Sequence, residues 1–387
     1  MSRKYMSNVP DIPVKKKILI THPWFLPAYK AGGPIQSLAN LCRNLKHEYA
    51  FFVLCSDRDH MDNQTLNGIV QDDWNDFENG TAQVFYLSAA NAKFSTIKKL
   101  VKQINPDIIF INGIYSPLFT LGALLSKTGK KILSARGMLH PGALGQKSLK
   151  KKIYLFFLKM LGVKDKVIFH ATDLKEEEYI HKIFGKNARV RIAQNFPNLA
   201  ESNNKLASSN GVLRIVSIAL ISPMKNHAIV LEGLKEISFP VEYDIYGPIK
   251  DVAYWDKCIQ LIGVLPANIK VAYKGSIEPA NVTNVLQNYH YLVQPSKSEN
   301  FGHSIFEALS CGLPVITSHF TPWNQLEENK AGWNVDIFDP GSMTEVLKKA
   351  NVANKNDYVT WSSSAKQFAK NQINLEEIKN QYKLLFH

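Results

Sequence analysis

The chain has 387 residues, of which 45% are apolar and 20% are charged. This length exceeds what one hydrophobic core usually spans and predicts two domains, while the composition excludes a largely disordered protein. The net charge of +13 predicts an anionic partner, which could be nucleic acid, a membrane surface or a phosphorylated substrate. The sequence contains no zinc finger, no RNP-like segment and no stripe of aromatic residues interleaved with arginines, so we expect no nucleic-acid partner.

The first 17 residues are basic but lack the apolar core of a secretory signal. The most apolar window, 107–125, contains Asp107, Asn112 and Pro117, which predicts a strand, a turn and a helix rather than a membrane span. The cysteines are far apart and have no zinc-ligand spacing: Cys42, Cys55, Cys258 and Cys311. We therefore expect a cytoplasmic protein that is at most peripheral on the inner face of the membrane.

Short apolar runs alternate with segments of helical period along the whole chain, as in repeated βαβ units. In the first half, strands are predicted over 16–22, 50–56, 82–87, 107–112, 131–136 and 167–171. A polar stretch at 198–211 is interpreted as a linker, and strands then resume over 213–220, 241–247, 270–275, 289–295 and 314–318. The predicted fold class is α/β, with two Rossmann-like, doubly wound domains of parallel strands that face a cleft. In such sheets ligands bind beyond the carboxyl ends of the strands.

The first loop of interest follows the opening strand. Gly32 and Gly33 allow close approach to the backbone, and Pro34 stands where a helix would begin. This loop could receive a phosphate, although a plain tight turn explains the same residues equally well.

A basic segment at 147–166 interrupts the alternation of strands and helices. It combines lysines with Tyr154, two phenylalanines and several aliphatic residues, as an amphipathic helix that lies on anionic lipid would. The alternative is a helix that faces the core and has a solvated lysine edge.

The loop after the first strand of the second half contains "ISPMKNH". Ser222 is a plausible N-cap and Pro223 a first helical residue, which would place Lys225 in the first helical turn. A cation there opposes the helix dipole, so its position favours a bound anion; an exposed lysine that tolerates this small penalty is the alternative.

The segment "PSKSENFGHS" leaves a buried strand and enters a helix near Phe301, whose free amides favour a phosphate. Glu299 and Glu307 flank this helix start. Carboxylates repel phosphates, so we expect both to accept hydrogen bonds from hydroxyl groups on either side of a diphosphate. A nucleotide sugar has this arrangement of groups; the alternative is that the glutamates only cap and decorate a helix.

Several segments in the expected order resemble the retaining GT-B glycosyltransferases of family 4. These segments are "YKAGGPIQS", "ARGMLHPGAL", "FHATDLKEEEYI", "SPMKNH", "DIYGPI", "YKGSI", "SENFGHSIFEALSCGLPVI" with its E-x7-E signature, "TPWNQLEE" and "AGWNV". The resemblance implies an N-terminal acceptor domain (1–197), a C-terminal donor domain (198–365) and a last helix (366–387) that packs back on the N-terminal domain.

The resemblance also implies roles for individual residues toward a nucleotide-diphosphate sugar. Glu307 would hold the ribose hydroxyls and Glu299 would lie beside the transferred sugar. Lys225 would neutralise the phosphates, and Gly33 would close the diphosphate from the N-terminal domain. Amides around the start of the helix would meet the sugar and the diphosphate: Asn300, Phe301 and Gly302.

One position departs from the family. An arginine usually stands five residues before the lysine, but this chain has Leu220. A cation is therefore missing where electrostatic stabilisation usually contributes most to rate. Arg136 or His140 could supply it; the alternative is that Arg136 only ties down a loop.

Three functions follow. The first is transfer of a sugar, with retention at the anomeric carbon, to a glycan or lipid-linked acceptor, in the assembly of a surface polysaccharide. The second is a sugar-nucleotide epimerase on the same fold. The third is a nucleotide-sugar-binding scaffold subunit without activity, which Leu220 makes credible.

Acidic pairs such as Asp57 with Asp59 and Asp72 with Asp73 resemble magnesium ligands. The first pair follows the second predicted strand, away from the motifs that would hold the diphosphate. Lysine and backbone amides can carry the phosphate charge, so we expect a metal-independent enzyme without a cofactor.

Overall fold

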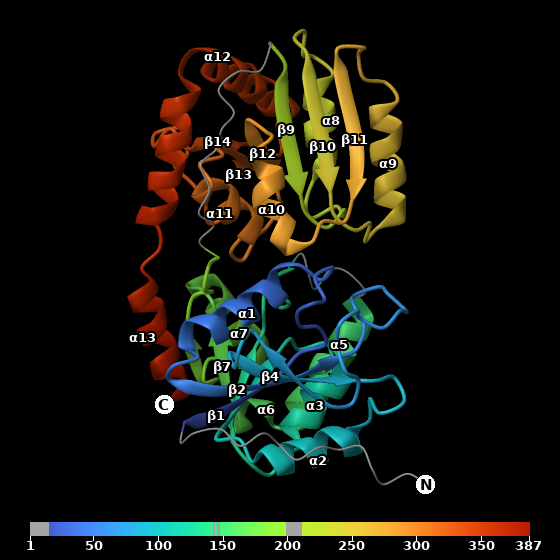
Figure 1. Ribbon diagram of the computed structural model, residues 1–387, viewed down its shortest axis with the longest axis vertical. Coiled ribbons are helices and arrows are strands. Elements are labelled where there is room, and N and C mark those ends of the chain that lie inside the picture. Colours follow the sequence, from blue (N-terminus) through green and yellow to red (C-terminus); the bar gives the residue numbers. More distant parts are fainter. Residues whose placement is uncertain (1–14, 142–143, 145–147, 199–210) are drawn as a thin grey trace. The chain divides into compact units, whose positions relative to one another are not determined.

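The computed structural model describes residues 15–141, 144, 148–198 and 211–387 (Figure 1). The chain forms two compact units. One comprises the chain up to Phe196 together with Leu375–His387, and the other comprises Pro197–Asn374. Residues 199–210 of the predicted linker lie outside the described residues.

The N-terminal unit is built on one sheet of order β3-β4-β2-β1-β5-β6-β7-β8. All neighbours pair in parallel except β3 and β4, which are antiparallel. The strands are β1 (Lys16–Thr21), β2 (Tyr49–Ser56), β3 (Trp74–Phe77), β4 (Ala82–Leu87), β5 (Ile108–Asn112), β6 (Lys130–Ser134), β7 (Ile168–Ala171) and β8 (Val190–Ile192). The inner strands are apolar along their length because helices cover both faces of a parallel sheet.

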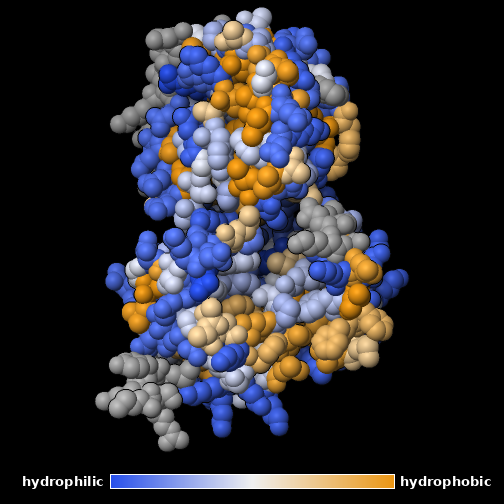
Figure 2. Space-filling model, turned by 90° about the vertical axis from the view of Figure 1, so that its right-hand side faces the viewer, coloured by the Kyte–Doolittle hydropathy of each residue, from blue (hydrophilic) through white to orange (hydrophobic). Residues whose placement is uncertain are grey.

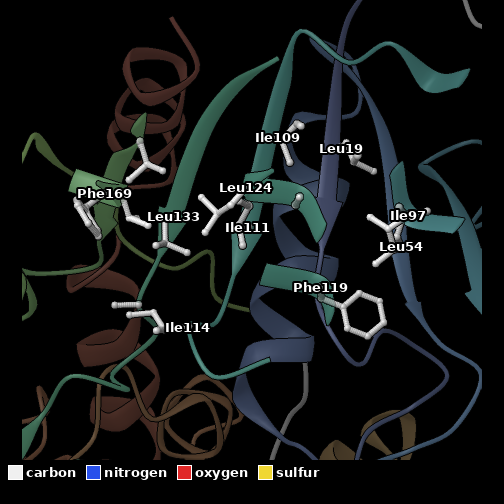
Figure 3. Close-up of a cluster of buried hydrophobic side chains, with 14 of the residues drawn as sticks. Leu19, Leu54, Ile97, Ile109, Ile111, Ile114, Phe119, Leu124, Leu133 and Phe169 are labelled. Carbon is white, nitrogen blue, oxygen red and sulfur yellow. The ribbon is translucent and has the colours of Figure 1, made fainter. Parts of the chain in front are cut away.

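One face of this sheet carries the main core of the unit. Leu19, Leu54 and Ile111 of the strands pack with Ile97 and Phe119 of the covering helices (Figure 3). On the opposite face, Tyr382 and Phe386 of the last helix contact Phe110 of β5. The helices are α1 (Gly33–Leu45), α2 (Phe94–Ile104), α3 (Pro117–Leu124), α5 (Ser148–Met160), α6 (Val163–Lys166), α7 (Leu174–Phe184) and α13 (Leu375–Phe386).

The C-terminal unit has a fully parallel sheet of order β11-β10-β9-β12-β13-β14. Its strands are β9 (Leu213–Ile218), β10 (Val241–Tyr246), β11 (Ile269–Gly275), β12 (Tyr291–Gln294), β13 (Val315–Ser318) and β14 (Gly332–Val335). Two apolar clusters fill the space between this sheet and the helices. The helices are α8 (His227–Leu234), α9 (Val252–Ile262), α10 (Pro279–Leu286), α11 (His303–Ser310) and α12 (Pro340–Asn371).

Each strand predicted from an apolar run is present, whereas β3, β8 and β14 were not predicted. All three lie at sheet edges. β3 and β8 are mostly half-exposed, which weakens their apolar signal. β14 contains Gly332 and Asn334, two residue types that are uncommon in strands.

The returning helix begins later than the sequence suggested. Residues 366–371 continue α12, and Phe368 and Ala369 are buried in the core of the C-terminal unit. The helix that belongs to the N-terminal unit is α13, which starts at Leu375. The start predicted at 366 is therefore wrong, because packing of α12 against its own unit extends past that point.

Candidate functional site

The C-terminal sheet reverses its winding between β9 and β12. The chain adds β10 and β11 on one side of β9 and then β12 on the other side. The loops that leave β9 and β12 at their carboxyl ends therefore meet, and such a point is where doubly wound sheets bind ligands. The amide of Lys297 donates to the carbonyl of Met224 at 2.8 Å and joins the two loops.

The two loops bring Lys225 and Glu299 into contact. The Lys225 ammonium donates to the Glu299 carboxylate, which also accepts from Gln294 Nε2 at 2.9 Å and from Ser296 Oγ at 2.7 Å. Ser304 Oγ of α11 in turn donates to Gln294 Oε1 at 2.8 Å. The glutamate is thus oriented by β12, by its own loop and by the loop after β9.

The environment of Glu299 keeps its carboxyl ionised. Burial by itself raises its pKa, but the ammonium of Lys225 and the hydrogen bonds from Ser296 and Gln294 outweigh burial and lower the pKa below its ordinary value. The side chains of Glu299 and Lys225 are 11% and 20% exposed. The pair is sheltered but accessible, so a ligand could exchange contacts with it.

The start of α11 lies beside this pair. Gly302 is its N-cap residue, with φ of 78°, and no side chain caps the helix. The first turn carries no acidic residue. Trp323 Nε1 donates to the carbonyl of Phe301 at 2.5 Å and holds the turn that precedes α11. Asn300 is the residue between Glu299 and Phe301 in this turn. The uncapped first turn and the dipole of this helix favour an anion.

Glu307 lies further along α11, is partly exposed and is electrostatically unlike Glu299. Burial raises the pKa of its carboxyl to about 7, and a hydrogen bond from Asn198 opposes this rise. No cation contributes to the shift. The two glutamates of the predicted signature therefore differ: one is held as a carboxylate by a lysine, and the other is close to half-protonated at neutral pH.

The position predicted for Lys225 within a helix is wrong. Residues 222–225 form a turn in which the amide of Lys225 donates to the carbonyl of Ser222 at 3.0 Å. Asn226 has a left-handed backbone with φ of 60°, and α8 begins only at His227. Lys225 therefore precedes the helix, and Glu299, rather than a helix dipole, determines its electrostatic setting.

In the N-terminal unit, Gly32 and Gly33 form the start of α1. Gly32 is the N-cap residue with φ of 73°, and the space that a Cβ would enter there is open. The preceding loop is fixed by Asp59, whose carboxylate accepts from the amides of Tyr29 and Lys30 at 2.9 and 3.1 Å. The start of α1, like that of α11, thus has no side-chain cap and follows a loop held by hydrogen bonds.

The acidic residues considered as metal ligands anchor loops. Asp57 accepts from Gln71 Nε2 at 2.5 Å, and Asp72 accepts from the amide of Ser88 and from Asn91 Nδ2. Within the described part of the chain, no group of histidine, cysteine and acidic side chains has the arrangement of a metal site.

Arg136 lies in the interior of the N-terminal unit and is 9% exposed. Its Nε donates to Asn112 Oδ1 at 3.0 Å, its Nη1 donates to Asn195 Oδ1, and its guanidinium lies over the ring of Phe110. These contacts tie the ends of β5 and β6 to the segment after β8. These contacts favour the alternative that Arg136 ties down a loop, and its expected role in place of the charge missing at Leu220 stays a prediction.

His140 follows β6 and is partly exposed. Its ring lies edge-on to Tyr179 at 5.3 Å between centroids. Burial, followed by the charge of Lys175, lowers the pKa of His140, so the ring is neutral at pH 7. Its expected role toward a substrate stays a prediction.

Sequence reasoning missed the residues that hold the two glutamates. Gln294, Ser296 and Ser304 surround Glu299, and Asn198 contacts Glu307. Gln294 and Ser296 gave a signal in the sequence, because polar residues at the end of an apolar strand lie at the ligand-binding edge of a parallel sheet. Asn198 gave none, since it is far from Glu307 along the chain.

Two family models match the chain. Residues 37–171 match "Glycosyl transferase 4-like", and residues 200–375 match "Glycosyl transferases group 1". Sucrose synthase 2 of Pisum sativum is 38% identical over 56 residues, which are 14% of this chain and 7% of that relative. The match therefore spans a small part of the relative's length.

The fold is that of several solved structures. Sucrose-phosphate synthase from Thermosynechococcus elongatus has a TM-score of 0.73 at 15% identity, over 96% of this chain and 98% of its own. HepE from Anabaena, in complex with UDP and glucose, has a TM-score of 0.68 at 17% identity, over 96% of this chain and 99% of its own. WaaG, a glycosyltransferase involved in lipopolysaccharide biosynthesis, has a TM-score of 0.66 at 13% identity, over 94% of this chain and 98% of its own. These similarities confirm the predicted GT-B fold.

Among the described residues, the structure contains no helix with the length and apolar character needed to span a membrane.

Proposed function

Because this chain consists of a glycosyl transferase 4-like domain followed by a glycosyl transferases group 1 domain, we propose that it transfers a sugar from a nucleotide-diphosphate sugar with retention at the anomeric carbon. The acceptor is a glycan or a lipid-linked saccharide, and the product belongs to a surface polysaccharide. HepE, which was solved in complex with UDP and glucose, and WaaG, a glycosyltransferase involved in lipopolysaccharide biosynthesis, support these assignments by analogy.

One observation carries the proposal. Where the winding of the C-terminal sheet reverses, an ammonium, a carboxylate and a helix start without a side-chain cap lie together. The diphosphate binds the amides of α11 and the ammonium of Lys225, because a phosphate anion is bound by hydrogen-bond donors and a positive charge. Glu299 accepts from hydroxyls of the transferred sugar, and Glu307 accepts from those of the ribose.

In the reaction, the bond between the anomeric carbon and the diphosphate oxygen breaks as a bond to the acceptor oxygen forms on the same face. The acceptor proton passes to the departing diphosphate, so the products are a glycoside and a nucleoside diphosphate. Lys225 stabilises the charge that develops on the leaving group. Glu299, whose carboxylate is held by Lys225, Gln294 and Ser296, orients the sugar; it is not assigned as a nucleophile by analogy with glycosidases, whose two carboxylates flank the scissile bond.

We propose that the reaction needs no metal, since Lys225 and the α11 amides supply positive charge to the diphosphate. Treatment with a chelator should leave turnover unchanged. A requirement for added magnesium would contradict this part of the proposal.

The test is incubation with uridine, guanosine, adenosine and thymidine diphosphate sugars and a pool of saccharide acceptors. A transferase releases the nucleoside diphosphate in proportion to glycoside formed, and the anomeric configuration of the product reports retention. Interconverted sugar nucleotides would identify an epimerase instead. A donor that raises the melting temperature without turnover would identify a binding subunit, which the absence of a cation at Leu220 favours as the second candidate.

A further inference from the structure

The helix α5 has two apolar faces, and only one of them is covered. Leu155 and Leu158 are buried in the core of the N-terminal unit. On the outer face, apolar side chains are 46–72% exposed: Leu149, Ile153, Phe156, Phe157 and Met160. Their spacing places them in one stripe along the helix. A helix that only packed on the core would carry polar residues there.

Apolar side chains gather on this face of the N-terminal unit in Figure 2, in which the side carrying α5 faces the viewer. Scattered exposed apolar residues need no explanation, but a continuous stripe indicates an interaction surface. The core already occupies the inner face of α5, so the stripe is available to a partner.

The charge around the stripe has one sign. Between Ser148 and Lys166 the chain has six lysines and a single acidic residue, Asp165. Lysines at 150, 152 and 159 are exposed on the same helix as the stripe. Lysine stems can lie along apolar surface while their ammonium groups reach anionic headgroups.

A basic concavity adjoins the end of the stripe. It has a volume of about 440 Å³ and is lined by Lys159, Lys164, Lys182, Ile183, Phe184 and Gly185. Lysines from three helices, α5, α6 and α7, therefore line this concavity, with no carboxylate among the lining residues. A phosphate headgroup has the charge that this arrangement favours.

From the stripe, the lysines and the concavity together, we propose that α5 docks the protein on an anionic lipid bilayer, with the apolar stripe among the acyl chains and lipid phosphates at the concavity. Self-association through the same face would oppose the lysines of one copy to those of the other. An anionic bilayer complements both the apolar stripe and the positive charge of the lysines, and we therefore propose it as the partner of this surface.

The test is flotation of the full chain with vesicles. We expect binding to phosphatidylcholine vesicles that contain about one third phosphatidylglycerol, little binding to pure phosphatidylcholine, and release of most protein at high salt. Failure to float with the anionic vesicles, or equal binding to both compositions, would overturn the proposal.

Two pairs of substitutions test the two components separately. Phe156→Ser with Phe157→Ser should weaken binding about tenfold for each residue. Lys159→Gln with Lys164→Gln should weaken it about fivefold for each. The matched controls are Val359→Ser with Leu384→Ser, which are 74% and 61% exposed elsewhere, and Lys257→Gln with Lys348→Gln; these should bind as the unmodified chain does.

Circular dichroism should show that all variants are folded, since the changed side chains are exposed. Binding that survives both test pairs would overturn the proposal, as would a dimer in solution that the phenylalanine substitutions dissociate. Vesicle binding needs no sugar transfer, so its outcome is independent of the proposed reaction.

Discussion

The two units of this protein use the same place in a doubly wound sheet for different purposes. Both sheets reverse their winding beside their first strand, between β1 and β5 and between β9 and β12. In the C-terminal unit this place holds Lys225 and Glu299, a charged pair that remains partly exposed. In the N-terminal unit it holds His22, Asn112 and Arg136, which are nearly inaccessible.

The chemistry of the two places differs accordingly. His22 Nδ1 contacts the carbonyl of Asn112 at 2.9 Å, and burial lowers the pKa of His22 to about 4, so the ring is neutral beside the guanidinium. Such a buried polar network fixes the ends of strands. The Lys225–Glu299 pair can instead share its ammonium with an incoming phosphate. Topology makes both places suitable for ligands, and burial distinguishes the polar network around His22 from the candidate binding site at Lys225 and Glu299.

The largest effect that would test this comparison is expected at Arg136. Arg136→Met should leave two buried amide oxygens, of Asn112 and Asn195, without donors and should destabilise the N-terminal unit by about 3 kcal/mol. Hydrogen exchange in β5 and β6 during urea titration measures this loss. Arg214→Met, which removes an exposed ion pair with Glu242, is the control and should cost under about 1 kcal/mol.

Donor binding by folded Arg136→Met protein should be unchanged. A variant that is stable but has lost turnover would instead support Arg136 as the replacement for the cation missing at Leu220.

The next effect is expected at the exposed pair. Glu299→Gln should keep the size of the side chain but lower turnover about 100-fold, because the amide no longer balances Lys225 or accepts equally from the sugar. Steady-state kinetics with a saturating donor measures the change. The control is Glu327→Gln. Glu327 also pairs with a lysine of the C-terminal unit, Lys349, but that ion pair is exposed. Equal rates in both variants would remove Glu299 from the site.

A smaller, pH-dependent effect is expected at Glu307. Burial raises its pKa from the ordinary 4.5 to about 7, so between these values the folded protein holds a proton that the unfolded chain has lost. The contribution of the neutral carboxyl to stability is therefore full below about pH 4.5 and is lost as the pH rises through about 7. Glu307→Gln should raise the melting temperature at pH 8 and have less effect at pH 5.

The same substitution should weaken donor binding about tenfold at pH 8, because a neutral amide is a poorer acceptor for ribose hydroxyls than a carboxylate. Titration calorimetry at both pH values measures this. A melting temperature that falls at pH 8 would contradict the electrostatic account of Glu307.

The smallest effect concerns the turn before α11. In Gly302→Ala the alanine must adopt the left-handed backbone of Gly302, with φ of 78°. Its Cβ would lie 3.1 Å from Ile305 Cδ1 and 3.3 Å from Trp323 Nε1. Gly275→Ala has nearly the same φ, 74°, with no atom within 4 Å. Both should lose about 1 kcal/mol to backbone strain. Gly302→Ala should lose roughly a further 0.5–1 kcal/mol to crowding and should also weaken donor binding. Chemical denaturation of the two variants measures the difference.

Local patterns in the sequence were sufficient for much of this protein. Apolar runs located the inner strands, because a parallel strand buried on both faces is apolar throughout. The strands β3 and β8 were missed because they are mostly half-exposed, and β14 was missed because it contains Gly332 and Asn334. The loops that carry Lys225 and Glu299 were also predicted, since the carboxyl ends of parallel strands meet at one edge.

The sequence by itself determined the class of fold, the positions of the inner strands along the chain and the loops that carry the candidate site, because each is encoded by residues close together along the chain. Only the tertiary structure decided that Lys225 pairs with Glu299, that Arg136 is buried and that α5 leaves an apolar stripe uncovered. These properties depend on which distant segments pack together and exclude water, and no local pattern specifies that.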